Sequence, residues 1–112
     1  MPELHPLPTY TVRVRRIDPT LAELHIVFEG LPADVDVRGR LMGPRCPGAS
    51  TIEVAYHLHR VAFGDYRVLI PEPVYWSPER PFVYEGPAEF SRQGQPAGTL
   101  WVSVGLRRGR EE

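Results

Sequence analysis

Proline and glycine interrupt this chain along its whole length, with 13 prolines and 10 glycines among 112 residues. Proline ends helices because it has no backbone N–H and its ring clashes with the preceding turn. The stretches between these residues are short, and apolar and polar residues alternate within them. A period of two is typical of strands that bury one face. The sequence therefore predicts an all-β protein.

Seven segments carry this alternation. The first two, 10–16 and 21–29, are joined by the short turn 18–20 and are expected to form a hairpin. The remaining five are 35–42, 51–61, 66–70, 82–90 and 100–106. About seven strands at this spacing predict an immunoglobulin-like antiparallel β-sandwich, and a small Greek-key barrel is the alternative.

The alternation also assigns side chains to faces. In the second segment, Glu23 and His25 are expected to point outward. Gly86-Pro87 predicts a bulge or a break in a strand at a sheet edge, because proline cannot donate to a ladder. In segment 51–61, one continuous strand is expected, with four residues facing the core: Ile52, Val54, Tyr56 and Leu58.

The length is that of one domain. Residues 1–8 are expected to be an extended N-terminal segment, 9–107 a single sandwich domain and 108–112 a polar tail. Between 71 and 81 the chain holds four prolines, so this stretch is expected to cross between sheets in an extended form.

Net charge and cysteine content limit which partners and which cellular compartment are expected. The net charge is −1, which gives no bulk attraction to nucleic acid or to an anionic membrane. All 13 basic residues are arginine, which the base composition of a GC-rich genome explains. Cys46 is the only cysteine, so no internal disulfide is expected. No signal peptide or membrane-spanning run is seen, and a soluble cytoplasmic protein is the expectation.

One string stands out from the general pattern, namely W-S-P-E-R-P-F-V-Y at residues 76–84. It resembles the W-S-P-x-x-P-[YF]-L-Y segment in the immunoglobulin-like domain of family 2 glycoside hydrolases, of the β-galactosidase and β-glucuronidase type. The flanking stretches 66–70, 90–94 and 104–107 are similar to that domain as well. The resemblance implies that the segment follows a strand and precedes the last two strands. The family's catalytic carboxylates lie in a separate barrel, so no catalytic residue is carried over.

The same string has a packing role that does not depend on the family. Its two prolines hold the connection extended at a low entropic cost. Its aromatic side chains can cover the open end of a sandwich. The expected structural residues are Trp76, Pro78, Pro81, Phe82 and Tyr84. A surface for stacking sugars, built from Tyr75, Trp76 and Trp101, is the functional alternative.

Two histidines, His57 and His59, point to one face of a continuous strand and have the spacing of a metal chelate. The site needs a third ligand, for which His25, Glu23 and Glu53 are the candidates. A solvated strand face with two ordinary histidines is the alternative. No carboxylate pair, nucleophile motif or phosphate-binding loop is found, so no catalytic residue and no cofactor are predicted.

These features favour a non-catalytic interaction or scaffolding domain. It is expected to present its edge strands to a protein partner or to a second copy of itself, and not to bind nucleic acid or membrane. One alternative is a carbohydrate-binding module that uses Tyr75, Trp76 and Trp101. The other is a small metal-dependent enzyme that uses His57 and His59.

Overall fold

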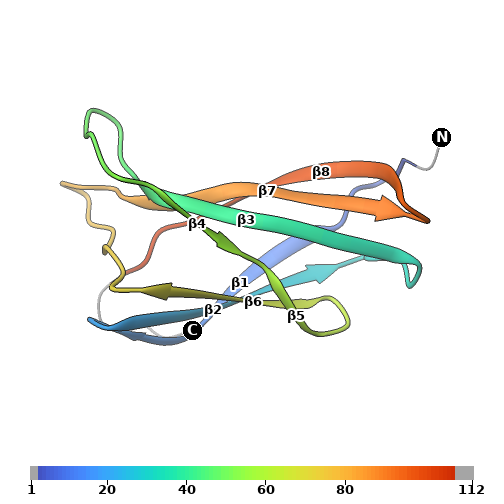
Figure 1. The fold of residues 1–112 in the computed structure, drawn as a ribbon, viewed down its shortest axis with the longest axis horizontal. Helices are drawn as coiled ribbons and strands as arrows, with labels where there is room; N and C mark the ends of the chain where they lie inside the picture. The colour runs from blue at the N-terminus through green and yellow to red at the C-terminus, as the bar shows by residue number, and fades with distance from the viewer. Residues whose placement is uncertain (1–2, 108–112) are drawn as a thin grey trace.

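The structure, a computed structural model, describes residues 3–107 and contains two four-stranded antiparallel sheets (Figure 1). The first sheet has the order β1 (Thr9–Asp18), β2 (Leu21–Glu29), β6 (Asp65–Pro71), β5 (His59–Ala62). The second has the order β4 (Val54–His57), β3 (Val35–Arg45), β7 (Val83–Arg92), β8 (Gln95–Val104). The all-β prediction is confirmed, and β1 and β2 form the expected hairpin.

The strand order is that of an immunoglobulin-like sandwich. Such a domain has strands A, B, E and D in one sheet and C, F and G in the other. Here β1-β2-β6-β5 takes the first set of positions and β3-β7-β8 takes the second, while β4 adds an edge strand beside β3. The predicted sandwich is therefore confirmed, with eight strands in place of about seven.

The core fills the space between the two sheets. Phe28 of the first sheet packs edge-on against Tyr66, with ring centroids 5.7 Å apart, and against Phe90 of the second sheet at 5.6 Å. In a strand, every second side chain points to the same face. The inward-facing rows predicted for β2, β6 and β8 supply most of the other large buried side chains. The largest side chains that are fully buried are Tyr84, Phe90, Leu24, Ile26, Leu41, Ile70, Leu106, Val68 and Val102.

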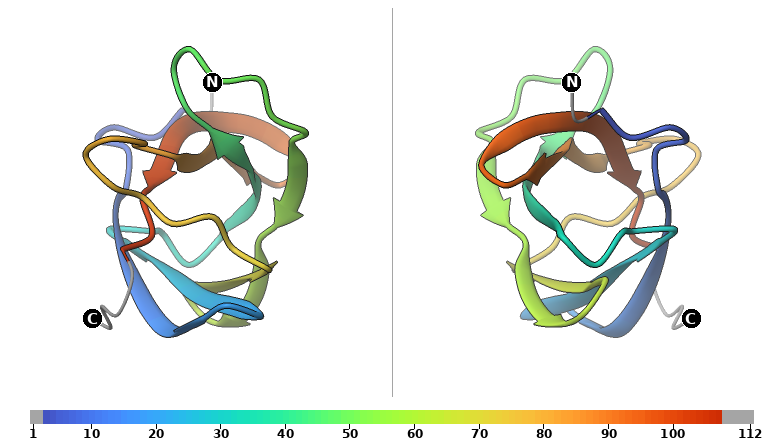
Figure 2. Two further views of the ribbon diagram at one scale, coloured as in Figure 1. Left: turned by 90° about the vertical axis from the view of Figure 1, so that its left-hand side faces the viewer. Right: turned by 90° about the vertical axis from the view of Figure 1, so that its right-hand side faces the viewer.

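The prediction of one strand at 51–61 is wrong. The chain runs beside β3 in the second sheet as β4, bends at Leu58, and continues beside β6 in the first sheet as β5. Figure 2 shows this segment closing one side of the sandwich. Ile52, expected inside, is 90% exposed. The error arises because alternation describes the two faces of a strand, and carries no information about a change of neighbouring strand.

The prediction of an edge at Gly86-Pro87 is also wrong. β7 is a central strand with β3 on one side and β8 on the other. A Cβ atom at Gly86 would overlap the backbone oxygen of Arg40. Gly86 therefore lets β3 approach β7 closely beside Pro87, which has no N–H to donate to the ladder. β7 continues past this point without a break.

Residues 72–82 connect the two sheets at one end of the sandwich. The Tyr84 hydroxyl accepts a hydrogen bond from the Val74 N–H at 3.0 Å, and the Trp76 N–H donates to the Leu106 oxygen at 2.6 Å. A tyrosine at the start of strand F that bonds to the upstream backbone is the tyrosine corner of immunoglobulin-like domains. Tyr84 is buried, Trp76, Pro81 and Phe82 are half-buried, and Pro78 is exposed.

Residues 3–8 lie beside the second sheet, where buried Leu4 donates its N–H to the Ala97 oxygen at 2.9 Å. The polar tail predicted at 108–112 lies outside the described residues. No helix in residues 3–107 has the length and apolar character that a membrane crossing requires.

Candidate functional site

Edge strands are the places where a sandwich offers unpaired backbone groups to other molecules. The four edges are β1, β5, β4 and β8. β1 carries the exposed side chains of Arg13, Arg15 and Arg16, and its register shifts between Val14 and Arg16. Charged side chains and a bulge both discourage another strand from pairing. β1 is therefore a protected edge.

The edge of β8 is capped by the chain itself at two points. The Ala97 oxygen accepts the Leu4 N–H at 2.9 Å, and the Ser103 N–H donates to the Tyr10 hydroxyl at 3.2 Å. Backbone groups of alternate residues face the same side of a strand. Thr99 and Trp101, between these caps, therefore also face the free side, and only this short stretch of β8 is open.

Residues 52–63 form an exposed segment that we call the edge ribbon. It contains β4 and β5, so it provides a free edge to both sheets. Only Tyr56 and Leu58 within it are half-buried, and all its other residues are exposed. Seven large apolar side chains in residues 3–107 are exposed, and four of them lie in the edge ribbon: Ile52, Val54, Val61 and Phe63.

Basic side chains surround the edge ribbon. His57 lies opposite Arg40 across β3 and β4, and His59 lies opposite Arg67 across β5 and β6. Among the described residues, no carboxylate lies within 4.0 Å of the guanidinium groups of Arg38, Arg40, Arg60 and Arg67. The nearby Glu53 is held by Arg45, with 2.9 Å between Oε1 and Nε. The ribbon is thus apolar, with positive charge beside it.

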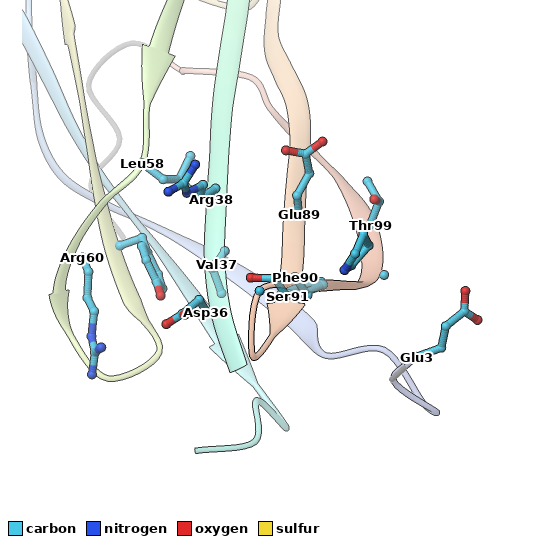
Figure 3. A pocket seen from close by; sticks show the side chains of 14 residues that line it. Glu3, Asp36, Val37, Arg38, Leu58, Arg60, Glu89, Phe90, Ser91 and Thr99 are labelled. Atoms are coloured by element: carbon cyan, nitrogen blue, oxygen red, sulfur yellow. The ribbon is translucent and has the colours of Figure 1, made fainter. Parts of the chain in front are cut away.

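An open groove of about 970 Å³ lies beside the ribbon, where the chain has left β3 to join β6. Figure 3 shows Asp36, Val37 and Arg38 along β3, with Leu58 and Arg60 contributed by the ribbon. Tyr66 also lines the groove, together with Val37 of β3. Burial raises the pKa of Tyr66. Tyr66 therefore lies beside the part of the β3 edge that the departing chain leaves open.

The residues proposed for a metal site are not brought together. His57 is in β4 and His59 in β5, so the two belong to different sheets, and both are exposed. Glu53 is paired with Arg45. Residues 3–107 hold no group of three or more His, Cys, Asp or Glu side chains that could bind a metal ion.

His25 lies on the outer face of β2, opposite Arg67 of β6, and is nevertheless buried, with 9% of the residue exposed. Its Nδ1 atom lies 2.8 Å from Asp65 Oδ1, and its Nε2 atom lies 3.1 Å from Glu23 Oε2. Asp65 comes from β6, so the cluster depends on the pairing of β2 with β6. No local signal in the sequence shows this pairing.

The three aromatic residues proposed for sugar binding have different surroundings. Tyr75 packs against the core, whereas Trp101 is 51% exposed and donates its Nε1–H to Glu85 at 3.3 Å. The Arg107 guanidinium lies 4.5 Å from the ring centroid of Trp76. Trp76 lines a hollow of about 740 Å³ whose lining includes Arg45 and Glu85 but neither Tyr75 nor Trp101. The three rings therefore do not form one stacking surface.

Comparison of the sequence with models of known protein families and with curated proteins finds no match. Among the edges, the hollow and the groove, the edge ribbon has both exposed apolar side chains and unpaired strand edges.

Proposed function

We propose that this chain is a non-catalytic interaction domain that binds a protein partner through the edge ribbon. One observation carries the proposal: four of the seven exposed large apolar side chains in residues 3–107 are concentrated in the segment that forms a free edge of both sheets. Exposed apolar groups that cluster mark interaction sites, and a free edge accepts a further strand. The open stretch of β8 has one such side chain, Trp101, whereas the ribbon has four.

Two further expectations belong to this proposal. Kinship with the accessory sandwich of family 2 glycoside hydrolases is supported by the position of residues 76–84, which follow β6 and precede the last two strands. A cytoplasmic location is supported by the single cysteine, since domains of oxidising compartments commonly use disulfides.

The proposal is tested by selecting peptides from a random library displayed on phage, with the full chain as target. Two proline variants locate the binding site. Ala55→Pro blocks the edge of β4, and Thr99→Pro is the matched control on the open stretch of β8. We expect selected peptides to bind the native chain and Thr99→Pro equally, and to bind Ala55→Pro at least about tenfold more weakly, because proline removes a donor from the edge.

The opposite ranking, with binding lost in Thr99→Pro and kept in Ala55→Pro, contradicts the proposal. It assigns the interaction to β8. A library that yields no peptide sensitive to either substitution also contradicts it.

A further inference from the structure

The backbone of β4 is suited to accept another strand. The Leu58 N–H donates to the Gly39 oxygen at 3.0 Å, so the odd-numbered residues of β3 direct their backbone groups toward β4. Leu41 pairs with Tyr56 and Gly43 pairs with Val54. The alternate residues of β4, Ala55 and His57, therefore direct their N–H and C=O groups to the free side.

β5 is a poorer acceptor. Its register with β6 shifts between Arg60 and Ala62, which places a bulge at Val61. A bulge leaves a residue unpaired and bends the edge. β4 keeps a regular register with β3 over all four of its residues. An added strand is thus expected to pair with β4.

The outer face beside β4 is positively charged. His57 lies opposite Arg40, and Arg38 follows on the same face of β3. Arg60 lies farther along the ribbon, in β5 of the other sheet, opposite Tyr66. Two carboxylates of β7 lie on the far side of β3, with Glu89 opposite Arg38 and Glu85 opposite Met42, and Asp36 lies at the end of the row. Glu85 is 3.5 Å from the Arg45 guanidinium. The free side of this face therefore carries an excess of positive charge.

The other face of β4 is apolar. Val54 and Tyr56 lie on the face shared with buried Leu41, and Val54 is 48% exposed. Ile52 precedes them and is almost fully exposed. The two faces of an added strand would therefore meet two different surfaces, one basic and one apolar.

We infer that the edge ribbon takes an extended peptide segment in which acidic and apolar residues alternate, added as a strand beside β4. This inference rests on the proposed function and specifies its partner. Acidic side chains on one face of the segment approach Arg40, Arg38 and His57. Apolar side chains on the other face cover Val54 and Ile52. The period of two in the partner follows from the period of two in β4.

A second copy of the chain fits this edge less well. A symmetric dimer places the same patch on both sides of the interface. Pairing two copies through β4 would bring Arg40 and His57 of each chain to the same basic face of the partner. Like charges across paired strands are destabilising. The charge of the ribbon thus favours a partner of opposite charge.

The test uses two short capped synthetic peptides, one that alternates valine with glutamate and one that alternates valine with lysine. Each is titrated into the isotopically labelled full chain, and amide shifts are followed by NMR. We expect the glutamate peptide to bind about tenfold more tightly, because opposite charges on paired strands attract and like charges repel. The shifts should centre on Ala55 and His57, and Ala55→Pro should abolish them.

Charge-reversed variants sharpen the test. The double variant Arg38→Glu with Arg40→Glu should prefer the lysine peptide, while Arg13→Glu on the distant β1 edge should keep the native preference. Circular dichroism checks that each variant retains its strands.

Equal binding of the two peptides, with sensitivity to Ala55→Pro, overturns the inference about charge and leaves the proposed function standing. Dimerisation that Ala55→Pro prevents identifies a second copy as the occupant, and again overturns the inference alone. If neither peptide binds and the library yields none that depends on Ala55, both the inference and the proposed function fail.

Discussion

Two of the five tyrosines accept hydrogen bonds from backbone N–H groups that have no partner strand. The hydroxyl of Tyr84 accepts the Val74 N–H in the crossing segment, and that of Tyr10 accepts the Ser103 N–H at the edge of β8. A backbone group that is buried without a partner costs about 1–3 kcal/mol. These hydroxyls therefore stabilise the ends and edges of the sheets.

Replacing Tyr84 with phenylalanine tests this role. The Tyr84→Phe variant leaves the partly buried Val74 N–H without its acceptor, so we expect the free energy of unfolding to fall by about 1–2 kcal/mol. Urea denaturation followed by circular dichroism measures the change. Tyr56→Phe is the control, because Tyr56 is half-buried and packs edge-on against the Tyr84 ring at 6.0 Å. A loss in Tyr56→Phe as large as that in Tyr84→Phe would contradict the assignment.

The central strand β7 depends on a glycine and a proline that follow each other. Pro87 lies opposite Trp101 of β8, and on its other side the ladder with β3 has no bridge between the Gly39–Ala88 and Met42–Glu85 pairs. Gly86 has no side chain, so the backbone of Arg40 can come close at this point. Proline is normally confined to edge strands. The close approach allowed by Gly86 explains how a central strand tolerates it.

The Gly86→Ala variant should therefore be strongly destabilised. Its Cβ atom would overlap the Arg40 oxygen, which is backbone and cannot rotate away. Overpacking of this kind costs about 1–3 kcal/mol, and more where the backbone must move. Thermal unfolding by calorimetry measures the loss, with Glu89→Ala on the exposed face of the same strand as control. If the two variants melt together, β3 and β7 are not as close as described.

The molecule as a whole has an unusual titration in alkali because it contains no lysine. Arginine stays charged to above about pH 12, so tyrosine is the side-chain type that titrates near pH 10. Burial raises the pKa of both Tyr66 and Tyr84 above the ordinary value of 10.0. Both phenols lie between the two sheets, so their protonation depends on the assembled sandwich and not on one strand.

Stability should therefore fall above about pH 10. In that range the unfolded chain loses tyrosine protons that the folded chain keeps, so unfolding releases protons and a rise in pH favours it. Below that range the stabilisation is fully present. Urea midpoints measured from about pH 9 to about pH 11 test this in a Cys46→Ser background, which removes the thiol titration. The combined Tyr66→Phe and Tyr84→Phe variant should show a flatter dependence, and an unchanged native midpoint would refute the prediction.

Much of the fold could be read from local patterns, and the reason is the period of strands. In three predicted strands, every second residue is apolar, and these rows end in Phe28, Ile70 and Leu106. Polar residues stand between them, as expected for strands that bury one face, so the rows are predicted to form the core. The exposure of Trp101 follows from the same pattern. The turns at 18–20 and 93–95 follow from their proline, glycine and polar residues.

What local patterns could not show is which strands become neighbours. The move from β4 to β5 at Leu58, the central place of Pro87 and the burial of His25 between Glu23 and Asp65 all depend on contacts between distant segments. The edge ribbon depends on the same change of sheet. Its strands β4 and β5 are edge strands because the chain passes from the second sheet to the first between them. The alternation of apolar and polar residues shows to which face of a strand each side chain points. Which strand lies beside it is determined by the packing of the whole chain.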